Sequence, residues 1–512
     1  MMDIKIIRKG ARFAEAELSL PLDADTSDIK AAINGKPVSF KGAISYIGNL
    51  KPETDYVLSV SYRNETAEAE FKTDYEFVTL DVRKFGAKGD GINDDTVYIQ
   101  AAVSACPENS RVLIPKGRYL VTNIFLKSNI NLELSEGAEL IANNNRYSHP
   151  IFPGMIESYD GDDEYNLGTW EGNPLKMFAG IITGVDVSGV TIYGEGTING
   201  NATHEDWWYN EKVMVGAFRP RLLFLNRCRN ITVCGLTFKD SPSWTIHPYF
   251  SDDICLSALR INNPCNSPNT DGIDVESCHN VKIEGVHFTL GDDCIALKSG
   301  KIYMGRKYNV PSENIHIRRC IMENGHGAVT LGSEMSAGIY GVTVEDCLFK
   351  NTDRGLRIKT RRGRGDKAVI DRILFRNIDM DGVKTPFVAN CFYFCDPDGR
   401  TAYVQDRNYH PVDERTPHIK SLMFEEIRCK NCHIAAAYFI GLPERKIGEI
   451  SMKNVKVSYA ENAESGVPAM LCGIEEMSRR GVIAENVEKL SLENVEINGQ
   501  TGEAFELINI GE

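Results

Sequence analysis

The sequence lacks several features, and each absence excludes a class of protein. No stretch of the 512 residues approaches the ~18 consecutive apolar residues of a membrane span, and no apolar run of secretory length opens the chain. A basic excess is also missing, because the formal net charge is −14, which argues against a nucleic-acid partner. We therefore expect a cytoplasmic protein without a membrane or nucleic-acid partner, unless a signal peptide has been removed.

A disulfide framework is likewise not indicated, although the chain has 14 cysteines. They are scattered, and many lie inside strand-like segments such as ITVCGL and VEDCLF, a pattern typical of buried reduced thiols. The lone pair Cys429 and Cys432 has no partner ligands at metal-binding spacing. We expect neither a zinc nor a redox site there.

The N-terminal residues 1–76 differ in texture from the rest. Segments of alternating polarity, AEAELSL, YVLSVSY and AEAEFKT, are separated by short polar turns and predict a small antiparallel β-sandwich. The stretch from Leu50 to Val60 resembles the fibronectin type III signature, in which a tyrosine hydroxyl, here that of Tyr56, ties down a corner. Residues 77–512 would form a second, larger domain.

A repeated unit dominates this second domain: a polar residue followed by a short alternating strand. Examples are Asn230-Ile231-Thr232-Val233, Asp253-Ile254-Cys255-Leu256, Asn280-Val281-Lys282-Ile283 and Asn314-Ile315-His316-Ile317. Repeats of about 23 to 34 residues without a helical half predict an all-β solenoid, a right-handed parallel β-helix, with a ladder of stacked Asn side chains. A single helix, VYIQAAVSAC, is expected near the start, with Asp95 or Thr96 as its N-cap.

Four short motifs carry candidate chemistry, and each falls about one coil after the last. They are Asn269-Thr270-Asp271-Gly272-Ile273-Asp274, Gly291-Asp292-Asp293-Cys294, Gly325-His326-Gly327 and Arg357-Ile358-Lys359. Taken singly, each reads equally well as a structural turn or strand. Because neighbouring coils lie ~4.8 Å apart, residues one coil apart can face the same groove. Asp292 and Asp293 can both do so only if the chain bends there, which Gly291 permits.

The order NTDGID, GDDC, GHG, RIK resembles the polygalacturonases of glycoside hydrolase family 28, and the likeness extends from about residue 80 to 440. This resemblance implies inverting hydrolysis of α-1,4-linked galacturonate without a required metal or other cofactor. It implies that Asp292 is the general acid, and that Asp271 and Asp293 hold and deprotonate the attacking water. Such an acid and base are expected ~6.5–9.5 Å apart, and three clustered carboxyls should retain at least one proton near neutral pH.

The same resemblance implies that His326 supports the protonation state of the acid, while Arg357 and Lys359 bind the substrate carboxylate. The segment 353–367, DRGLRIKTRRGRGDK, is strongly basic within an acidic chain. Because guanidinium groups recognise carboxylates, this reversal of charge favours a polyanionic substrate such as an oligogalacturonide or pectic polysaccharide. Lys298 is expected to add to this positive field.

Further features favour exo-hydrolysis, in which galacturonate is released from non-reducing ends. The segments SPSWTIHP and GSE look similar to those of exo-acting members, so His247 and Glu334 are expected to contact the terminal sugar. Asn269 of the first motif is a further candidate for substrate binding. A long insertion at about 143–178 is expected to wall off one end of the groove.

Three alternatives stay open. A relative of the same fold that hydrolyses rhamnogalacturonan or xylogalacturonan would share the four motifs. A pectate lyase would use Ca²⁺ and a basic residue to abstract a proton. A non-catalytic sugar-binding β-helix would need none of the aspartates for its role. The sequence leaves the oligomeric state undetermined.

Overall fold

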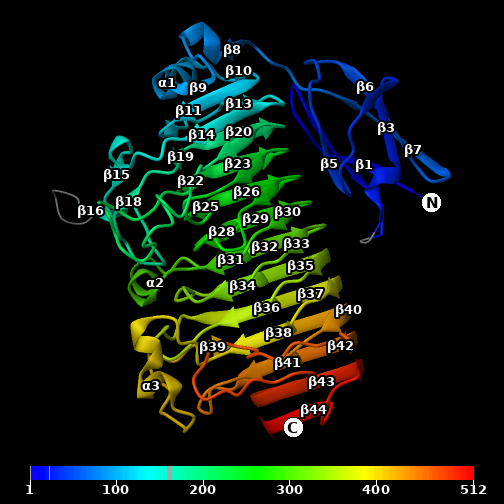
Figure 1. Cartoon of the computed structure of the whole chain (residues 1–512), viewed down its shortest axis with the longest axis vertical. Coiled ribbons are helices and arrows are strands. Elements are labelled where there is room, and N and C mark those ends of the chain that lie inside the picture. Colours follow the sequence, from blue (N-terminus) through cyan, green and yellow to red (C-terminus); the bar gives the residue numbers. More distant parts are fainter. Residues whose placement is uncertain (1, 22–23, 158–163, 512) are drawn as a thin grey trace.

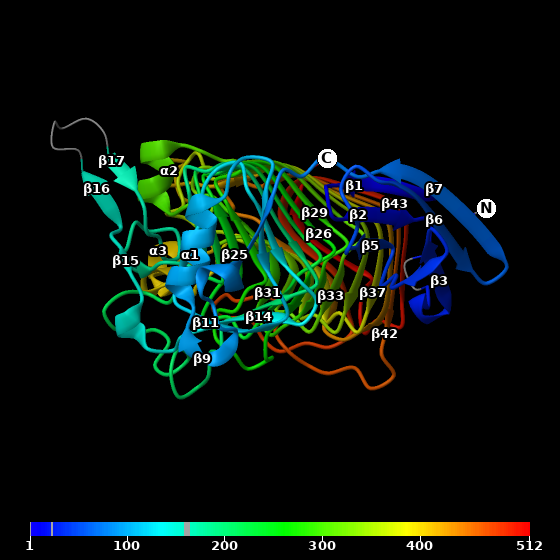
Figure 2. The ribbon, with the colours of Figure 1, turned by 90° about the horizontal axis from the view of Figure 1, so that it is seen from above.

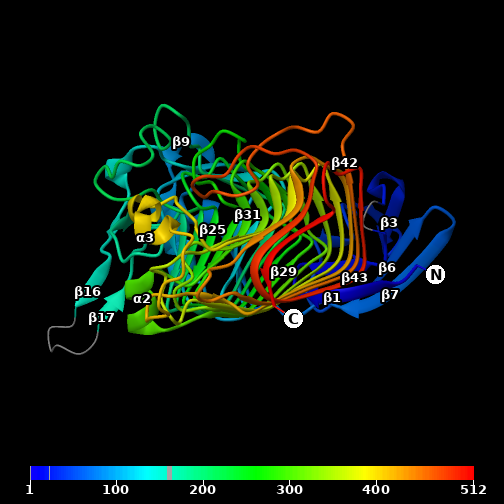
Figure 3. The same ribbon diagram turned by 90° about the horizontal axis from the view of Figure 1, so that it is seen from below.

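Two parts make up the structure, which is a computed structural model describing residues 2–21, 24–157 and 164–511. A long solenoid of stacked strands carries a small β-sandwich beside the N-terminal half of its length (Figure 1). Viewed along the stack in Figures 2 and 3, the sandwich lies on one side of the column of coils and the short helices lie on the other. The all-β class predicted from the repeats is confirmed.

Two antiparallel sheets, with strand orders β1-β2-β5 and β4-β3-β6-β7, form the sandwich. Their strands are β1 (Ile4–Lys9), β2 (Ala14–Leu18), β3 (Ile29–Ile33), β4 (Lys36–Val38), β5 (Ile44–Ile47), β6 (Asp55–Tyr62) and β7 (Glu65–Lys72). Alternate residues such as Ala16 and Leu58 face one shared apolar core, as the period of a strand requires. The Lys51 N–H donates to the Tyr56 hydroxyl at 2.9 Å, which is the predicted corner tie. A fibronectin type III relationship stays a prediction.

The solenoid has three faces, and on each face the strands of successive coils pair in parallel. The face that carries the candidate site, called the site face below, contains β12 (Ile124–Phe125), β19 (Ile182–Val185), β22 (Leu223–Asn226), β25 (Ile246–Tyr249), β28 (Ile273–Glu276), β31 (Asp293–Lys298), β34 (Gly327–Gly332), β36 (Arg354–Lys359), β38 (Thr385–Asn390), β41 (Ala435–Ile440), the first residues of β43 (Arg480–Asn498) and β44 (Phe505–Ile510). The second face begins with β8 (Thr79–Asp81), β10 (Arg111–Ile114), β13 (Asn131–Leu134), β20 (Ser188–Gly194), β23 (Arg229–Cys234), β26 (Asp252–Ser257), β29 (His279–Glu284) and β32 (Ser312–Arg318).

The third face begins with β9 (Asp90–Asp94), β11 (Gly117–Val121), β14 (Ala138–Ala142), β21 (Thr197–Asn199), β24 (Thr237–Lys239), β27 (Arg260–Asn262), β30 (His287–Thr289) and β33 (Ile321–Glu323). In the C-terminal coils, long strands bend around the corner and serve both the second and the third face, as β35 does by pairing with β32 and β33. These later strands are β35 (Ile339–Lys350), β37 (Val369–Asp381), β40 (Ser421–Cys432), β42 (Ile447–Tyr459) and β43 (Arg480–Asn498), and the first residues of β43 also pair with β41 on the site face. The short strand β39 (His418–Ile419) pairs with the start of β37.

The predicted repeat units lie in register on the second face. Ile231 pairs with Ile254, Ile254 with Val281, and Val281 with Ile315, so that apolar side chains stack inside the column. The residue before each of these adopts a left-handed backbone, which Asn and Asp tolerate better than most residues. Side chains of these residues form the predicted ladder: Asn314 Nδ2 donates to Asn280 Oδ1 at 2.6 Å, and Asn280 Nδ2 donates to Asp253 Oδ1 at 3.1 Å.

Helices are short and lie outside the column of strands. They are α1 (Thr96–Ala105), α2 (Ile302–Tyr308) and α3 (Ala402–Gln405), with 3-10 turns at Thr26–Asp28, Val82–Phe85, Arg146–Ser148 and Pro397–Arg400. The predicted helix is α1, at the N-terminal end of the stack (Figure 1). Asp95 precedes it but does not cap it with its side chain, because that carboxylate accepts from the Lys88 and Gly89 N–H groups instead. Among the described residues, no helix is long and apolar enough to cross a membrane.

Ion pairs hold the sandwich against the corner between the second and third faces. Arg8 Nη2 lies 3.1 Å from Glu284 Oε2, and Arg318 Nη1 lies 2.7 Å from Glu17 Oε1. Glu15 is completely buried at this junction and pairs with Arg8. Since a buried pair that loses one partner is strongly destabilised, these contacts fix the position of the sandwich on the solenoid.

The predicted insertion folds across the outside of the site face. It contains two small hairpins, β15 (Ile151–Phe152) with β18 (Met177–Phe178), and β16 (Met155–Glu157) with β17 (Glu164–Asn166), and its residues 158–163 lie outside the described ranges. Asn226 Nδ2, at the end of β22, donates to the Leu167 carbonyl at 3.0 Å. The Tyr249 hydroxyl, at the end of β25, donates to Asn166. The insertion therefore covers the coils that precede the candidate site.

Candidate active site

The three aspartates of the motifs converge on the site face. Asp271 lies in the turn before β28, Asp292 lies in the bend before β31, and Asp293 is the first residue of β31. Each residue offers one carboxylate oxygen such that these three oxygens lie within 4.8 Å of one another. Because β28 and β31 are paired neighbours on this face, one coil step brings the motifs together as predicted.

Two glycines make this convergence sterically possible. A Cβ on Gly291 would lie 2.0 Å from the Cys265 carbonyl oxygen, so only glycine allows the bend that presents both Asp292 and Asp293. A Cβ on Gly327, in the next coil, would lie 2.9 Å from Asp293 Oδ1. Gly291 of the GDDC motif therefore leaves room for the nearby backbone at Cys265, and Gly327 of the GHG motif leaves room for the Asp293 carboxylate.

Asp293 is held between two cations. Arg357 Nη1 donates to its Oδ1 at 2.8 Å, and Lys359 Nζ donates to its Oδ2 at 2.9 Å. Arg357 and Lys359 are two residues apart on β36, so both side chains leave the same side of that strand. The sequence assigned these cations to the substrate; in the structure each also neutralises Asp293 and keeps further N–H donors.

The pKa values of the cluster are pushed apart. Burial, and then the negative charge of Asp292, raise the pKa of Asp271 well above its ordinary value. Burial also acts to raise the pKa of Asp293, but Lys359 and Arg357 outweigh it and leave that pKa well below its ordinary value. One member of the cluster thus stays ionised while another retains its proton to higher pH, as the sequence led us to expect.

The carboxylates of the cluster lie close together. One oxygen of each lies within 4.8 Å of the others. The stack explains this closeness, because the paired strands β28 and β31 are only one interstrand spacing apart. The expected ~6.5–9.5 Å between acid and base stays a prediction, and the nature of the nucleophile is argued below from charge.

His326 forms a pair with an aspartate that the sequence analysis missed. Its Nδ1 lies 2.8 Å from Asp353 Oδ2, and its backbone N–H donates to the Asp292 carbonyl at 3.0 Å. The Asp353 hydrogen bond raises the pKa of His326. Burial raises the pKa of Asp353, but the hydrogen bond from His326 and the nearby Arg354 lower it to about 2. Asp353 is the first residue of the basic segment that contains Arg357. This position in the sequence could have identified it as a candidate site residue.

The basic segment 353–367 is not a free cationic surface, contrary to the sequence-based expectation. Arg361 Nη1 lies 2.8 Å from Asp398, Arg364 Nη2 lies 2.9 Å from Asp396, and Arg362 Nε lies 2.6 Å from Glu444 inside the protein. These arginines anchor the loops that contain α3 and the turn after β41. Arg357 and Lys359 alone among these five basic residues pair with the aspartate cluster.

His247, Lys298 and Glu334 are buried and make contacts within the protein, and their predicted roles in substrate binding stay predictions. His247 is fully buried, and its Nε2 lies 3.0 Å from Glu276 Oε2. Lys298 Nζ lies 3.0 Å from Glu334 Oε2 and 4.4 Å from the ring centre of Trp244. Burial lowers the pKa of His247 well below 6.5.

Asn269 is half-buried beside the triad, and its Oδ1 accepts from Arg219 Nη2 at 2.6 Å. Further groups that the analysis missed include Trp244, which lies in the SPSWTIHP segment, and Asp274, which closes the NTDGID motif. Lys298 Nζ lies 3.6 Å from Asp274 Oδ1. Both residues belong to motifs from which the sequence analysis selected other residues. The motifs could have pointed to them, but nothing in the sequence ranks one residue of a motif above another.

Comparison with known proteins agrees with this geometry. Residues 110–471 match the family described as glycosyl hydrolases family 28, and residues 79–134 match rhamnogalacturonase A/epimerase, pectate lyase-like. A probable polygalacturonase of Vitis vinifera is 31% identical over 404 residues, covering 77% of each chain.

Two solved structures share the fold. The family 28 exopolygalacturonase of Yersinia enterocolitica has a TM-score of 0.68 at 19% identity and covers 100% of this chain and 98% of its own. The hyperthermoactive exopolygalacturonase of Thermotoga maritima has a TM-score of 0.65 at 24% identity, covering 82% of this chain and 92% of its own. Because the family match spans more than half of the residues, this chain belongs to glycosyl hydrolases family 28.

Proposed function

We propose that this enzyme hydrolyses α-1,4-linked galacturonate in pectic chains, and that water attacks the anomeric carbon directly. The observation that carries the proposal is the convergence of Asp271, Asp292 and Asp293 beside the cations Arg357 and Lys359. An ionised carboxylate, a proton-bearing carboxyl and spare cationic donors together match what hydrolysis of a uronate chain needs.

Charge favours water over a carboxylate as the nucleophile. Both oxygens of Asp293 are bound to cations, which weakens it as a nucleophile but leaves lone pairs to accept a proton from water. The raised pKa of Asp271 keeps it from serving as a ready anionic nucleophile. Asp292 is the more exposed member, and we assign it the protonation of the leaving oxygen, because it lies within the same cluster as the proton that Asp271 retains and can pass that proton on. NMR of the first-formed sugar tests this proposal, and a product of retained anomeric configuration would overturn it.

The mode of action that we propose is exo. The insertion closes the groove on the side of the preceding coils, where the Trp170 ring stacks on Phe218 at 4.7 Å and the Lys301 N–H donates to the Gly172 carbonyl at 3.0 Å. A chain can then extend only toward the later coils. The exo-acting names of the two solved relatives point the same way.

The exo test uses trigalacturonate labelled at its reducing end, with early products separated by chromatography. We expect monomeric galacturonate from the unlabelled, non-reducing end as the first product. A ladder of oligomers from polygalacturonate in the earliest samples would contradict exo action. Parallel assays on rhamnogalacturonan and xylogalacturonan decide between this substrate and the related ones.

The aspartate cluster does not favour the Ca²⁺-dependent lyase. Its carboxylate oxygens are close enough to share a cation, but those of Asp293 are already paired with Arg357 and Lys359. A metal ion would have to compete with two fixed positive charges at short range. The donor set therefore fits a hydrolase with built-in cations better than a calcium site.

A further inference from the structure

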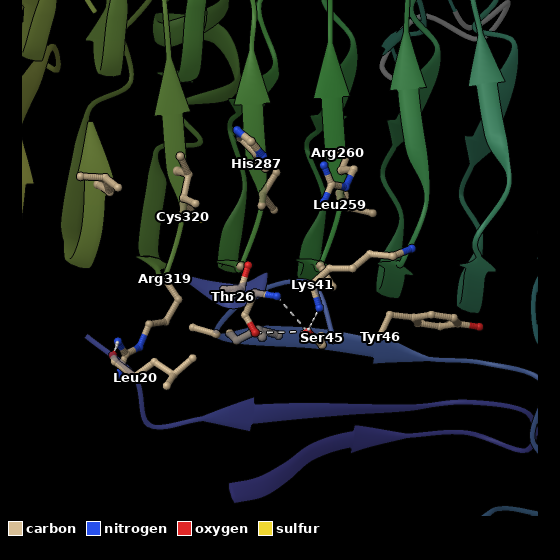
Figure 4. A pocket seen from close by; sticks show the side chains of 18 of the residues that line it. Leu20, Thr26, Lys41, Ser45, Tyr46, Leu259, Arg260, His287, Arg319 and Cys320 are labelled. Atoms are coloured by element: carbon tan, nitrogen blue, oxygen red, sulfur yellow. Dashed lines mark hydrogen bonds between the residues drawn. The ribbon is translucent and has the colours of Figure 1, made fainter. Parts of the chain in front are cut away.

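A cavity lies where the sandwich meets the solenoid, away from the site face. It has a volume of about 220 Å³ and lies between the segment before β5 and the strands β27, β30 and β33 of the third face (Figure 4). Since a water molecule occupies about 30 Å³ of liquid, the cavity has room for about one sugar ring rather than for an oligomer.

Both walls of the cavity are fixed. On the sandwich side, the Lys41 N–H donates to Ser45 Oγ at 2.8 Å and the Ser45 hydroxyl donates to the Gly42 carbonyl at 3.2 Å, so that the loop is tied to itself (Figure 4). On the solenoid side, Arg260 and His287 are paired positions of adjacent strands and point from neighbouring coils. The cavity is therefore part of the folded structure and needs no closing movement.

The charges that line the cavity compensate one another, with one exception. Lys41 Nζ lies 3.0 Å from Glu195 Oε1, and Arg319 Nε lies 3.8 Å from Asp346 Oδ2. Arg260 is exposed, and the described part of the chain supplies no ion pair or hydrogen bond for its guanidinium group. One cation with its five N–H donors is thus left for a group from outside.

The remaining lining suits a sugar ring. Apolar side chains such as Leu20, Pro21 and Leu259 offer surface for C–H groups, and the hydroxyls of Thr26 and Thr237 are available as partners for sugar hydroxyls. An Arg guanidinium binds a carboxylate through two parallel hydrogen bonds, which makes it selective for a planar anion. A few polar groups placed among apolar ones is the usual composition of a small-molecule site.

We propose that this junction cavity is a non-catalytic binding site for a hexuronate unit, with Arg260 recognising its carboxylate. The unit can belong to a substrate chain or be free product, since both carry the same carboxylate and ring hydroxyls. The inference rests on the proposed function for its choice of sugar. It gives the sandwich a role in holding a uronate beside the solenoid.

The test measures binding of trigalacturonate and, separately, of galacturonate by isothermal titration calorimetry to full-length Asp292→Asn protein, in which turnover of the ligand is strongly reduced. We expect two sites for at least one of these ligands. In Asp292→Asn/Arg260→Glu the second site should weaken by at least tenfold, with the first unchanged. The matched control is Asp292→Asn/Arg229→Glu, at an exposed arginine of the second face, which should retain both sites.

The two ligands, trigalacturonate and galacturonate, distinguish a uronate unit of a substrate chain from free product. A second site that takes trigalacturonate but not galacturonate indicates a chain-holding site, and one that takes the monomer indicates a product site. Neutral galactose, which has no carboxylate, should not bind to the cavity. Competition by sulfate as strong as that by a uronate would overturn the proposal, because the cavity would then recognise negative charge alone. A single site in all variants, or equal binding by the Arg260 and Arg229 variants, would also overturn it.

The outcome is independent of the catalytic assignment. Hydrolysis of trigalacturonate by the unmodified enzyme together with unchanged binding in the Arg260 variant defeats only the cavity site. Failure of the unmodified enzyme to hydrolyse any galacturonide defeats the proposed function, whatever the calorimetry shows.

Discussion

His326 Nδ1 lies 2.8 Å from Asp353 Oδ2. The carboxylate of one coil thus orients the histidine of the coil before it and favours its protonated form. The hydrogen bond engages Nδ1 with Asp353 and leaves Nε2 available for other contacts. His326 is more than half exposed, whereas Asp353 is largely covered, so the pair joins a solvent-facing imidazole to a fixed anchor.

Asp353→Asn should shift the pH profile of kcat/KM. The Asp353 hydrogen bond raises the pKa of His326, so its removal lowers that pKa and His326 loses its proton at a lower pH. We expect the alkaline limb of the profile to move toward lower pH, with a small effect at the acidic end. Asp366→Asn, an exposed carboxylate of the same segment, is the control. Identical profiles for both variants would show that the pair does not tune the site.

Lys359→Met should destabilise the fold as well as impair activity. It leaves the buried Asp293 carboxylate with one cation instead of two, and breaking a buried pair costs about 3–5 kcal/mol. Urea unfolding at pH 7 measures the loss. The double variant Asp293→Asn/Lys359→Met should recover part of it, because no buried charge is then left unpaired. Strictly additive losses would show that the two residues are not coupled.

The stability contributed by Asp293 should depend on pH in a defined direction. Lys359 and Arg357 hold its folded-state pKa below the unfolded value, so the unfolded state binds more protons on this group as the pH falls. The contribution is therefore fully present above the unfolded pKa of about 3.9 and declines below it. In Asp293→Asn this part of the acid-induced loss should disappear. Unfolding curves recorded between pH 7 and pH 3 check the difference.

Asp292→Asn should lower kcat by roughly 10²- to 10⁴-fold, the range attributed to general acid–base groups, while leaving the unfolding transition nearly unchanged. The residue is half-buried in a bend and its loss removes no ion pair among the described residues. Reducing-sugar release from trigalacturonate measures the rate, and calorimetric binding shows whether the ligand is still held. Full activity in the variant would favour the non-catalytic alternative.

Activity should survive an excess of chelator. The cations of the site are Arg357 and Lys359, which EDTA does not remove. Reducing-sugar release with EDTA should equal that without it, and ultraviolet absorbance should stay flat because hydrolysis creates no double bond. Rising absorbance that requires added Ca²⁺ would establish the lyase instead.

The stacking of the coils and the convergence of the aspartates can be predicted from local sequence patterns. The stacking of Ile231, Ile254 and Val281 follows from their place in the repeat, since a strand period of two and a regular coil length leave one register for apolar side chains. Convergence of Asp271, Asp292 and Asp293 follows from the same regularity. The bend at Gly291 was also foreseeable, because adjacent residues reach one face only at an irregularity.

The surroundings of individual side chains were not readable in this way. His247, Lys298 and Glu334 were expected to meet substrate, and the pattern did not show that they are buried with His247 beside Glu276 and Lys298 beside Glu334. Arg361 and its neighbours looked like a binding surface, yet acidic residues from loops further along the chain neutralise them. In each case the deciding partner comes from a remote segment whose position only the folded coil path determines.

The sequence by itself determined the coil repeat, the stacking of the core and the alignment of the catalytic motifs, because all three depend on spacing along a regular strand. The tertiary structure decided which charges are compensated, which side chains the insertion buries, and that Asp293 is shared between Arg357 and Lys359. Burial and ion pairing depend on distances between segments far apart in the chain, and no local pattern contains those distances.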